Sequence, residues 1–128
     1  NNKMSDDGLK VLAKALGTGT APCLELLSME GCKISDEGVM ALATSLMSGC
    51  CPLLNEVLLG DGLTDVALES LAQTITAGKM AELNWLDLRG NPAVTNKGAL
   101  TIGQAILKGA PKISCLVITG CPKLTKND

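Results

Sequence analysis

The sequence predicts an α/β solenoid, a curved horseshoe segment with a parallel sheet on its concave side and helices on its convex side. Two observations predict it. One apolar segment recurs four times, with central residues 30, 29 and 30 positions apart, and a helical pattern follows the first three copies. Trp85 is the only aromatic residue among 128. An aliphatic core suits thin repeated layers, whereas a compact globule of this size normally fills its centre with aromatic rings.

The recurring segments share the pattern L-x-x-L-x-L-x-x-(N/C/G). They begin at Leu24, Leu54, Leu83 and Ile113, and their central residues are Leu27, Val57, Leu86 and Leu116. Because side chains alternate along a strand, Leu27 and Met29 are expected to point inward. One repeat cannot bury its apolar strand and helix faces alone, so stacked repeats are expected to share one continuous core.

Each predicted helix has recognisable ends. The expected N-caps, whose side-chain oxygens accept a free backbone N–H, are Ser35, Thr64 and Thr95. The glycines expected to close the helices in a left-handed conformation are Gly49, Gly78 and Gly109. Helices pack about 8–10 Å apart and strands about 4.8 Å apart, so the helices should form the outside of the curve.

The two ends of the sequence do not contain complete repeats. Residues 5–16 match the helical half of a repeat, and residues 124–128 match the loop that opens another helix. Residues 1–128 are therefore expected to form a single domain of about four repeats plus a partial N-terminal helix. Without polar capping repeats, this domain is expected to be a fragment of a longer protein.

These repeats resemble leucine-rich repeats of the ribonuclease-inhibitor type. That pattern is a strand L-x-x-L-x-L-x-x-(N/C)-x-L followed by a helix x-x-x-G-x-x-x-L-x-x-x-L. The class includes ribonuclease inhibitor, the Ran GTPase-activating protein, the tropomodulin C-terminal domain and the sensor domains of NOD-like receptors. The resemblance implies a horseshoe segment that binds proteins through its concave sheet or its rims.

Four features depart from this pattern. Gly62 stands where Asn or Cys is usual, the same repeat is one residue short before Leu63, Ala67 replaces the glycine that opens the helix, and one residue is inserted after Pro92. The usual Asn or Cys satisfies backbone groups in the turn. We therefore expect the turn at Gly62 to be less well tied.

Composition excludes several classes of function. Eleven basic and thirteen acidic residues give a net charge of −2, which argues against a nucleic-acid partner. No apolar run approaches the roughly 18 residues that a membrane span needs. Histidine is absent, so a Ser or Cys nucleophile has no imidazole base. There is no phosphate-binding loop and no zinc-type cysteine spacing, and we expect no enzyme, cofactor or metal.

The six cysteines do not form a disulfide-framework pattern. Cys32 and Cys121 fall at equivalent turn positions, where a structural role is expected, and this indicates reduced thiols and a cytoplasmic, intracellular setting. Cys50 and Cys51 are expected in a more exposed loop, as two ordinary thiols rather than a reactive pair. Cys115 is expected on the concave face.

The outward strand positions should form columns across the concave face. The columns are Glu25, Asn55, Asn84 and Ser114; Leu26, Glu56, Trp85 and Cys115; Ser28, Leu58, Asp87 and Val117; and Glu30, Gly60, Arg89 and Thr119. Trp85 is the leading candidate, because exposed tryptophans are enriched at binding hot spots. Alternatively, its ring folds over neighbouring strand residues or lies under a loop.

Charge and apolarity add two further expectations. Glu25, Glu30, Glu56, Asp61 and Asp87 lie in or beside the strands against Arg89 alone, which favours a basic or mixed partner surface. The alternatives are ordinary solubilising charge and a weak surface pairing of Arg89 with Asp87 or Glu30. Leu26, Leu58 and Val117 are expected to form an apolar patch with Trp85, or to be covered by flanking segments.

The resulting hypothesis is a protein-interaction module that binds another protein through its concave sheet or rim. The candidate partner-binding residues are Trp85, Glu56, Asp87, Arg89, Leu58, Leu26, Glu30, Asn84 and Asn55. The alternative is a scaffold segment that continues a longer solenoid or self-associates through open sheet edges at residues 24–29 and 113–118. A GTPase-activating segment, which the resemblance alone implies, is less favoured.

Overall fold

The computed structural model describes residues 5–29, 32–60 and 62–118, in which helices and strands alternate. The elements are α1 (Asp6–Gly17), β1 (Leu26–Met29), α2 (Asp36–Leu46), β2 (Glu56–Leu59), α3 (Asp65–Thr76), β3 (Trp85–Asp87), α4 (Asn96–Gly109) and β4 (Cys115–Val117). This order places a helix before the first strand, as the sequence predicted.

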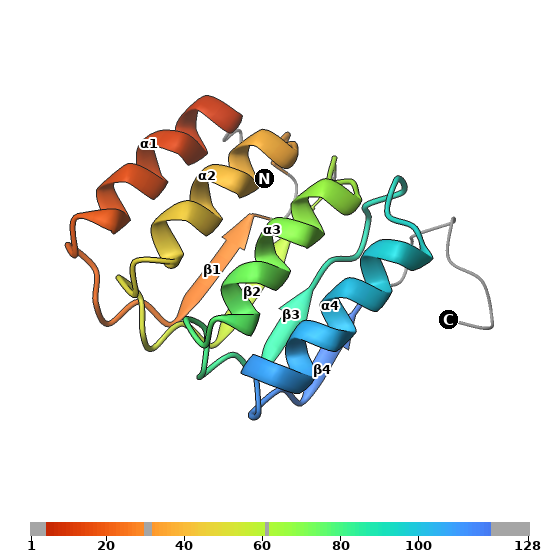
Figure 1. Cartoon of the computed structure of the whole chain (residues 1–128). Coiled ribbons are helices and arrows are strands. Elements are labelled where there is room, and N and C mark those ends of the chain that lie inside the picture. Colours follow the sequence, from red (N-terminus) through yellow and green to blue (C-terminus); the bar gives the residue numbers. More distant parts are fainter. Residues whose placement is uncertain (1–4, 30–31, 61, 119–128) are drawn as a thin grey trace.

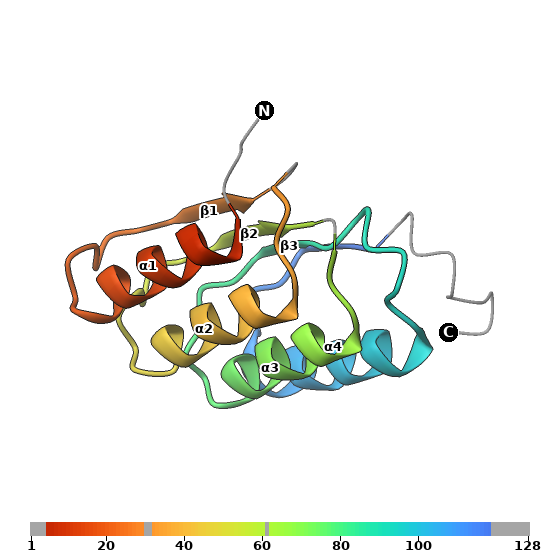
Figure 2. The same ribbon diagram turned by 90° about the horizontal axis from the view of Figure 1, so that it is seen from above.

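The elements form two layers. The strands make one parallel sheet in the order β1-β2-β3-β4, and the helices lie side by side over one face of it (Figure 1). Seen from above, strands and helices separate into two rows (Figure 2). The predicted α/β solenoid is confirmed. We call the sheet face that points away from the helices the concave face.

The core is an aliphatic layer between the sheet and the helices. Leu27 and Met29 are buried, as predicted, and so are Val57 and Leu86 in the neighbouring strands. Leu116 pairs in register with Leu86 but remains 38% exposed. The reason is its place on β4, the outermost strand of the sheet.

Aspartates at the helix starts connect each repeat to the next. Asp36, the first residue of α2, accepts hydrogen bonds from the Thr64 backbone N–H at 2.8 Å, the Thr64 hydroxyl and the Ala67 N–H at 3.2 Å. The same arrangement recurs between Asp6 and Ser35 and between Asp65 and Thr95. We call these three contacts the aspartate clamps.

Ser35, Thr64 and Thr95 are all N-cap residues, as predicted. The side chains of Thr64 and Thr95 accept hydrogen bonds from the backbone N–H groups of Val66 and Lys97. The expected side-chain bond is missing at Ser35. Its hydroxyl donates to Asp6 of the preceding repeat instead.

The prediction of left-handed glycines at the helix ends is right at two positions and wrong at the third. Gly49 and Gly78 adopt the left-handed conformation, with φ of 80° and 79°. The prediction is wrong for Gly109, which is the last residue of α4 and has no positive φ. A Cβ atom at Gly109 would overlap the carbonyl oxygen of Ile75. Gly109 is therefore explained by the close approach of α4 to α3.

The turn at Gly62 is well tied, contrary to expectation. Asn91, in the following repeat, donates from Nδ2 to the Leu59 carbonyl at 3.0 Å and to the Leu88 carbonyl at 2.7 Å. Its Oδ1 accepts from the Leu63 N–H at 3.1 Å. The Leu59 carbonyl and the Leu63 N–H on either side of Gly62 are thus bonded by a side chain of the next repeat.

Close packing explains the glycine at position 62 itself. A Cβ atom there would lie 2.7 Å from the carbonyl oxygen of Ile34 in the preceding repeat. A side chain would therefore push the two repeats apart, and the departure from the family pattern has a steric cause.

Substitution of Asn91 tests this bridge. Asn91 is fully buried, so Asn91→Ala should lower the free energy of unfolding by about 2 kcal/mol or more, since each buried group left without a partner costs about 1–3 kcal/mol. Chemical denaturation followed by circular dichroism measures the change. The exposed Asn84 provides the control, because Asn84→Ala removes no buried contact. Equal effects of the two variants would contradict the bridge.

The aspartate clamps predict a difference in unfolding free energy between a clamp variant and an exposed-aspartate variant. Asp36→Ala removes the acceptor for Thr64 and Ala67 and should cost about 1–3 kcal/mol of unfolding free energy. Asp7→Ala, at an exposed position in the first turn of α1, should lose only the interaction with the helix dipole, about 0.3–1 kcal/mol. Urea denaturation of both variants gives the comparison. A clamp variant no less stable than Asp7→Ala would refute the role of the carboxylate.

Candidate functional site

Strand register brings the predicted candidates together on the concave face. Leu26, Glu56, Trp85 and Cys115 are paired across the four strands, and so are Ser28, Leu58, Asp87 and Val117. Two of the four predicted columns are therefore confirmed as adjacent rows. Neighbouring strands lie about 4.8 Å apart, so the side chains of each row are within contact range.

The sequence allowed either an exposed Trp85 ring or a ring packed against its neighbours, and the structure shows something of both. Its side chain is 37% exposed, so the ring is partly open to solvent and partly packed against its surroundings. Leu26 is 50% exposed on β1, with Glu56 of β2 between it and Trp85, and Leu58 and Val117 are half-buried. We call Leu26, Leu58, Trp85 and Val117 the Trp85 patch.

The sequence predicted Asp87 to be an accessible acidic residue. In the structure, however, Asp87 is only 2% exposed. The Arg89 guanidinium covers its carboxylate. Nε lies 3.0 and 2.9 Å from the two carboxylate oxygens, and the Nη2 atom lies 2.7 Å from Oδ2. The Arg89 backbone N–H also donates to Oδ1 at 3.1 Å. The expected pairing of these residues is confirmed, but the pair is more than a surface contact.

The Arg89 contacts change the acidity of Asp87. Hydrogen bonds from the Arg89 side chain hold the pKa of the Asp87 carboxyl below its ordinary value, although burial acts in the opposite direction. A hydrogen bond with the Trp85 side chain lowers this pKa further. Asp87 and Arg89 therefore form an ionised support beside the tryptophan.

Asp87 does not add free acidic charge to the concave face, contrary to the prediction. Asp87 is neutralised by Arg89, and Glu30 and Asp61, together with the possible Glu30–Arg89 pair, lie outside the described residues. Glu25 is exposed and Glu56 is half-buried. Two carboxylates therefore carry the acidic charge in the described part of this face.

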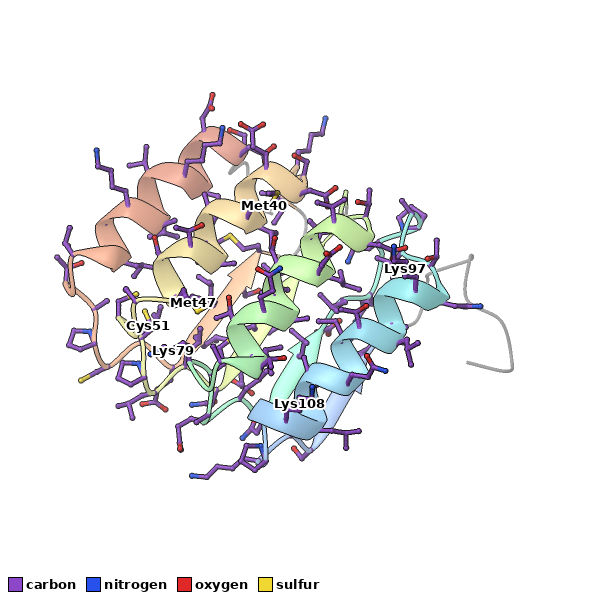
Figure 3. All side chains as sticks on the ribbon, in the orientation of Figure 1. Met40, Met47, Cys51, Lys79, Lys97 and Lys108 are labelled. Carbon is purple, nitrogen blue, oxygen red and sulfur yellow. The ribbon has the colours of Figure 1, made fainter. Side chains whose placement is uncertain are left out.

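Lysines lie on the other layer, as expected. Lys97 and Lys108 are carried by α4 on the helical side of the molecule (Figure 3). Lys10 of α1 pairs with Glu37 of α2. Charge is thus distributed unevenly between the sheet and the helices.

Asn55 and Asn84 line the rim where the strands begin. The Asn55 carbonyl accepts the N–H groups of Asn84 and Trp85, and the Asn84 carbonyl serves the next strand in the same way. The Asn55 side chain donates to the Leu53 carbonyl at 3.2 Å. The Asn84 side chain is exposed, so it is the more accessible of the two predicted contact residues.

The cysteines lie partly where predicted. Cys32 is fully buried in its turn, as expected, whereas Cys121 lies outside the described residues. Cys115 is half-buried. The expectation of an exposed Cys50–Cys51 loop is wrong for Cys51, which is 2% exposed.

The two adjacent thiols are close but chemically unequal. Their Sγ atoms lie 3.7 Å apart. Burial, with a smaller contribution from Cys50, raises the pKa of the Cys51 thiol to about 11. The thiolate is the reactive form of cysteine, so Cys51 is a weak nucleophile at neutral pH.

Two exposed leucines were missed by the sequence analysis. Leu100 and Leu107 of α4 are 63% and 88% exposed. They lie seven residues apart on one side of the helix. A comparison of equivalent helix positions between repeats would have found them, because Glu69 and Thr76 occupy these positions in α3.

Among residues 5–29, 32–60 and 62–118, no helix is long and apolar enough to cross a membrane. The same ranges contain no group of three or more acidic or cysteine side chains that could hold a metal ion.

Comparison with known families agrees with the architecture. A family model described as Leucine Rich repeat matches residues 20–43, which include β1 and the first part of α2. A search of the curated proteins finds no match. The family match supports a leucine-rich repeat protein, and the parallel sheet with its alternation of strands and helices gives an α/β solenoid fold.

The Asp87–Arg89 pair predicts a pH-dependent stability term. Since the folded pKa of Asp87 is lowered, the pair stabilises the fold above the ordinary aspartate pKa of about 3.9 and loses this effect as pH falls through the folded value. Arg89→Gln should cost about 1–3 kcal/mol at neutral pH, because it leaves a buried carboxylate poorly paired. The difference from wild type should shrink as Asp87 becomes protonated.

Urea denaturation across a pH series measures this difference. Lys112→Gln is the matched control, since it breaks the exposed Lys112–Glu82 pair and should cost less than about 1 kcal/mol. An effect of Arg89→Gln that is constant with pH would contradict the assignment.

Proposed function

We propose that this domain binds another protein through its concave face, with the Trp85 patch as the central contact. Leucine-rich repeats generally mediate protein–protein interaction and are generally not enzymes. The observation that carries the proposal is a partly exposed tryptophan beside exposed and half-buried aliphatic side chains on a regular sheet. Tryptophan in such a setting offers a large contact area at a low cost in conformational entropy.

The Asp87–Arg89 pair supports this proposal by restricting Trp85. The Trp85 side chain interacts with the Asp87 carboxyl and lowers its pKa, and three side-chain bonds from Arg89 fix Asp87 in turn. A side chain that is already ordered loses less entropy on binding. In this proposal Asp87 is a positioning residue, whereas Trp85, Leu26 and Leu58 contact the partner.

The partner proposed here presents an apolar side chain next to basic groups. Leu26 and Leu58 would receive the apolar group, and Glu25 and Glu56 would attract the basic groups, chiefly by raising the rate of encounter. Arg89 and Asn84 lie at the rim of the same surface, and both are exposed. The ribonuclease-inhibitor subtype of the repeat and the absence of enzymatic activity are part of the same proposal.

An intracellular, reducing setting is also proposed. It rests on cysteine spacing and on the burial of Cys32 and Cys51 as thiols. The GTPase-activating alternative stays an untested prediction.

Substitution of Trp85 tests the binding site. Proteins captured by the wild-type domain are identified by mass spectrometry, and the affinity of each purified candidate is then measured by calorimetry. Trp85→Ala should weaken a genuine complex by about 30-fold or more, equivalent to about 2 kcal/mol. Glu56→Lys should weaken it less and mainly slow association.

A matched control comes from the helical layer. Val66 of α3 is 51% exposed, so Val66→Ala trims an exposed apolar side chain away from the concave face and should leave affinity unchanged. Asp87 is unsuitable for charge reversal, because its carboxylate is buried. Wild-type affinity in both Trp85→Ala and Glu56→Lys would overturn the concave-face site.

A further inference from the structure

Two adjacent thiols lie in the loop that joins α2 to β2, and Figure 3 shows the second of them, Cys51, near the end of α2. The Sγ atoms of Cys50 and Cys51 are 3.7 Å apart. A disulfide needs its two sulfurs about 2.05 Å apart. Rotation of one side chain about its Cα–Cβ bond moves a sulfur atom further than this difference. The two sulfurs can therefore meet without a long-range rearrangement of the chain.

Repeat packing explains one of these cysteines but not the other. The counterparts of Cys51 in the other repeats, found from the strand register, are Ala21, Met80 and Ala110. This position is apolar in every repeat, and Cys51 fills it as a small apolar side chain. The counterparts of Cys50 are Thr20, Lys79 and Gly109. These three have no chemistry in common, so packing does not explain a thiol at position 50.

The contacts that hold the two sulfurs in place are weak. The Cys50 thiol donates to the Ser45 carbonyl at 3.3 Å, and the Cys51 thiol donates to the Ala21 carbonyl at 3.9 Å. A thiol is a weak hydrogen-bond donor. Releasing both sulfurs from these carbonyls therefore costs little.

The two thiols differ in how easily a reagent can reach them. Cys50 is half-buried, whereas Cys51 is 2% exposed. Burial also raises the pKa of the Cys51 thiol to about 11, so a reagent in solution finds little Cys51 thiolate. A group already bonded to Cys50 is different, because a sulfur held in contact with its target reacts far faster than the same group free in solution. Cys50 is thus suited to react first and Cys51 second.

We propose that Cys50 and Cys51 form a reversible oxidation site that reacts with a low-molecular-weight disulfide, such as oxidised glutathione, and closes into a disulfide between the two adjacent residues. Cys50 takes up one half of the reagent as a mixed disulfide. Cys51 then displaces that half.

The reaction balances in two exchange steps. The Cys50 thiol loses its proton to water and its sulfur attacks one sulfur of the reagent, whose S–S bond breaks; one half leaves as a thiolate and takes up a proton. The Cys51 thiol then loses its proton and its sulfur attacks Cys50 Sγ, which expels the second half in the same way. Two protein thiols are oxidised to one disulfide, and the reagent is reduced to two thiols.

The spacing of the two residues makes this bridge reversible. Adjacent Cα atoms are about 3.8 Å apart across a trans peptide bond, whereas most disulfides join Cα atoms about 4.4–6.8 Å apart. A disulfide forced away from its usual geometry is more easily reduced. The bridge is therefore suited to transient oxidation and is not a permanent link.

Trypsin isolates this pair from the other cysteines. Residues 34–79, released by cleavage after Lys33 and Lys79, contain no other lysine, arginine or cysteine. The folded protein is treated with oxidised glutathione, the remaining thiols are alkylated with iodoacetamide in denaturant, and the peptides are weighed by mass spectrometry. Peptide 34–79 should be lighter than its reduced form by two hydrogen atoms and carry neither glutathione nor an alkyl group. Dithiothreitol added before alkylation should restore two alkylated cysteines.

Two variants separate the roles of the thiols. Each takes the residue found at the same position of the first repeat, Cys50→Thr or Cys51→Ala, and circular dichroism confirms folding. Cys51→Ala should retain one glutathione on peptide 34–79, because the mixed disulfide has no second thiol to displace it. Cys50→Thr should leave the peptide without glutathione, because Cys51 is buried. Peptide 15–33 is the internal control, since the exposed Cys23 within it should take up glutathione in every sample.

Three results would overturn the inference. They are a wild-type peptide 34–79 that is alkylated at both cysteines while peptide 15–33 carries glutathione, a wild-type peptide 34–79 that keeps glutathione, and a disulfide that links peptide 34–79 to another part of the chain. The oxidation site does not rest on the proposed function, because the α2–β2 loop is separate from the Trp85 patch. Its failure would therefore leave the concave-face proposal intact.

Discussion

The structure depends on the hydrogen bonds that hold each repeat to the next. A carboxylate at the start of one helix accepts the backbone N–H and hydroxyl of the next N-cap residue, and this contact occurs at Asp6, Asp36 and Asp65. Hydrophobic burial supplies most of the free energy of stacking but does not fix a unique alignment. The clamps do so, because they require one N-cap to lie opposite one carboxylate. Strand register, and therefore the rows of the concave face, depends on that alignment.

Sequence reasoning found the fold and the rows for a simple physical reason. The alternation of side chains along a strand and the spacing of about 30 residues are local properties that any single repeat displays. The columns built from Leu26 and Ser28 therefore agree with the observed register. Nothing about a partner was needed for that prediction.

The errors concern contacts between residues that the pattern treats as independent. Asp87 was predicted to be accessible, but Arg89, two residues further along, covers it. Gly109 was interpreted as a helix stop, whereas the carbonyl of Ile75 in another repeat explains it. Cys51 was expected to be exposed because its loop was considered without the core beneath it. The exposed leucines of α4 were missed because one repeat pattern hides differences between equivalent positions.

The bond network of Asn91 also determines when each part of the chain can reach its final structure. The turn between Leu59 and Leu63 is completed by a side chain that lies 28 residues after Leu63. During synthesis, this turn cannot form all its bonds until the following strand has emerged and docked. The repeat that contains this turn thus matures one step behind the growing end of the chain. Folding that begins at the N-terminus would leave this layer incomplete until Asn91 has docked.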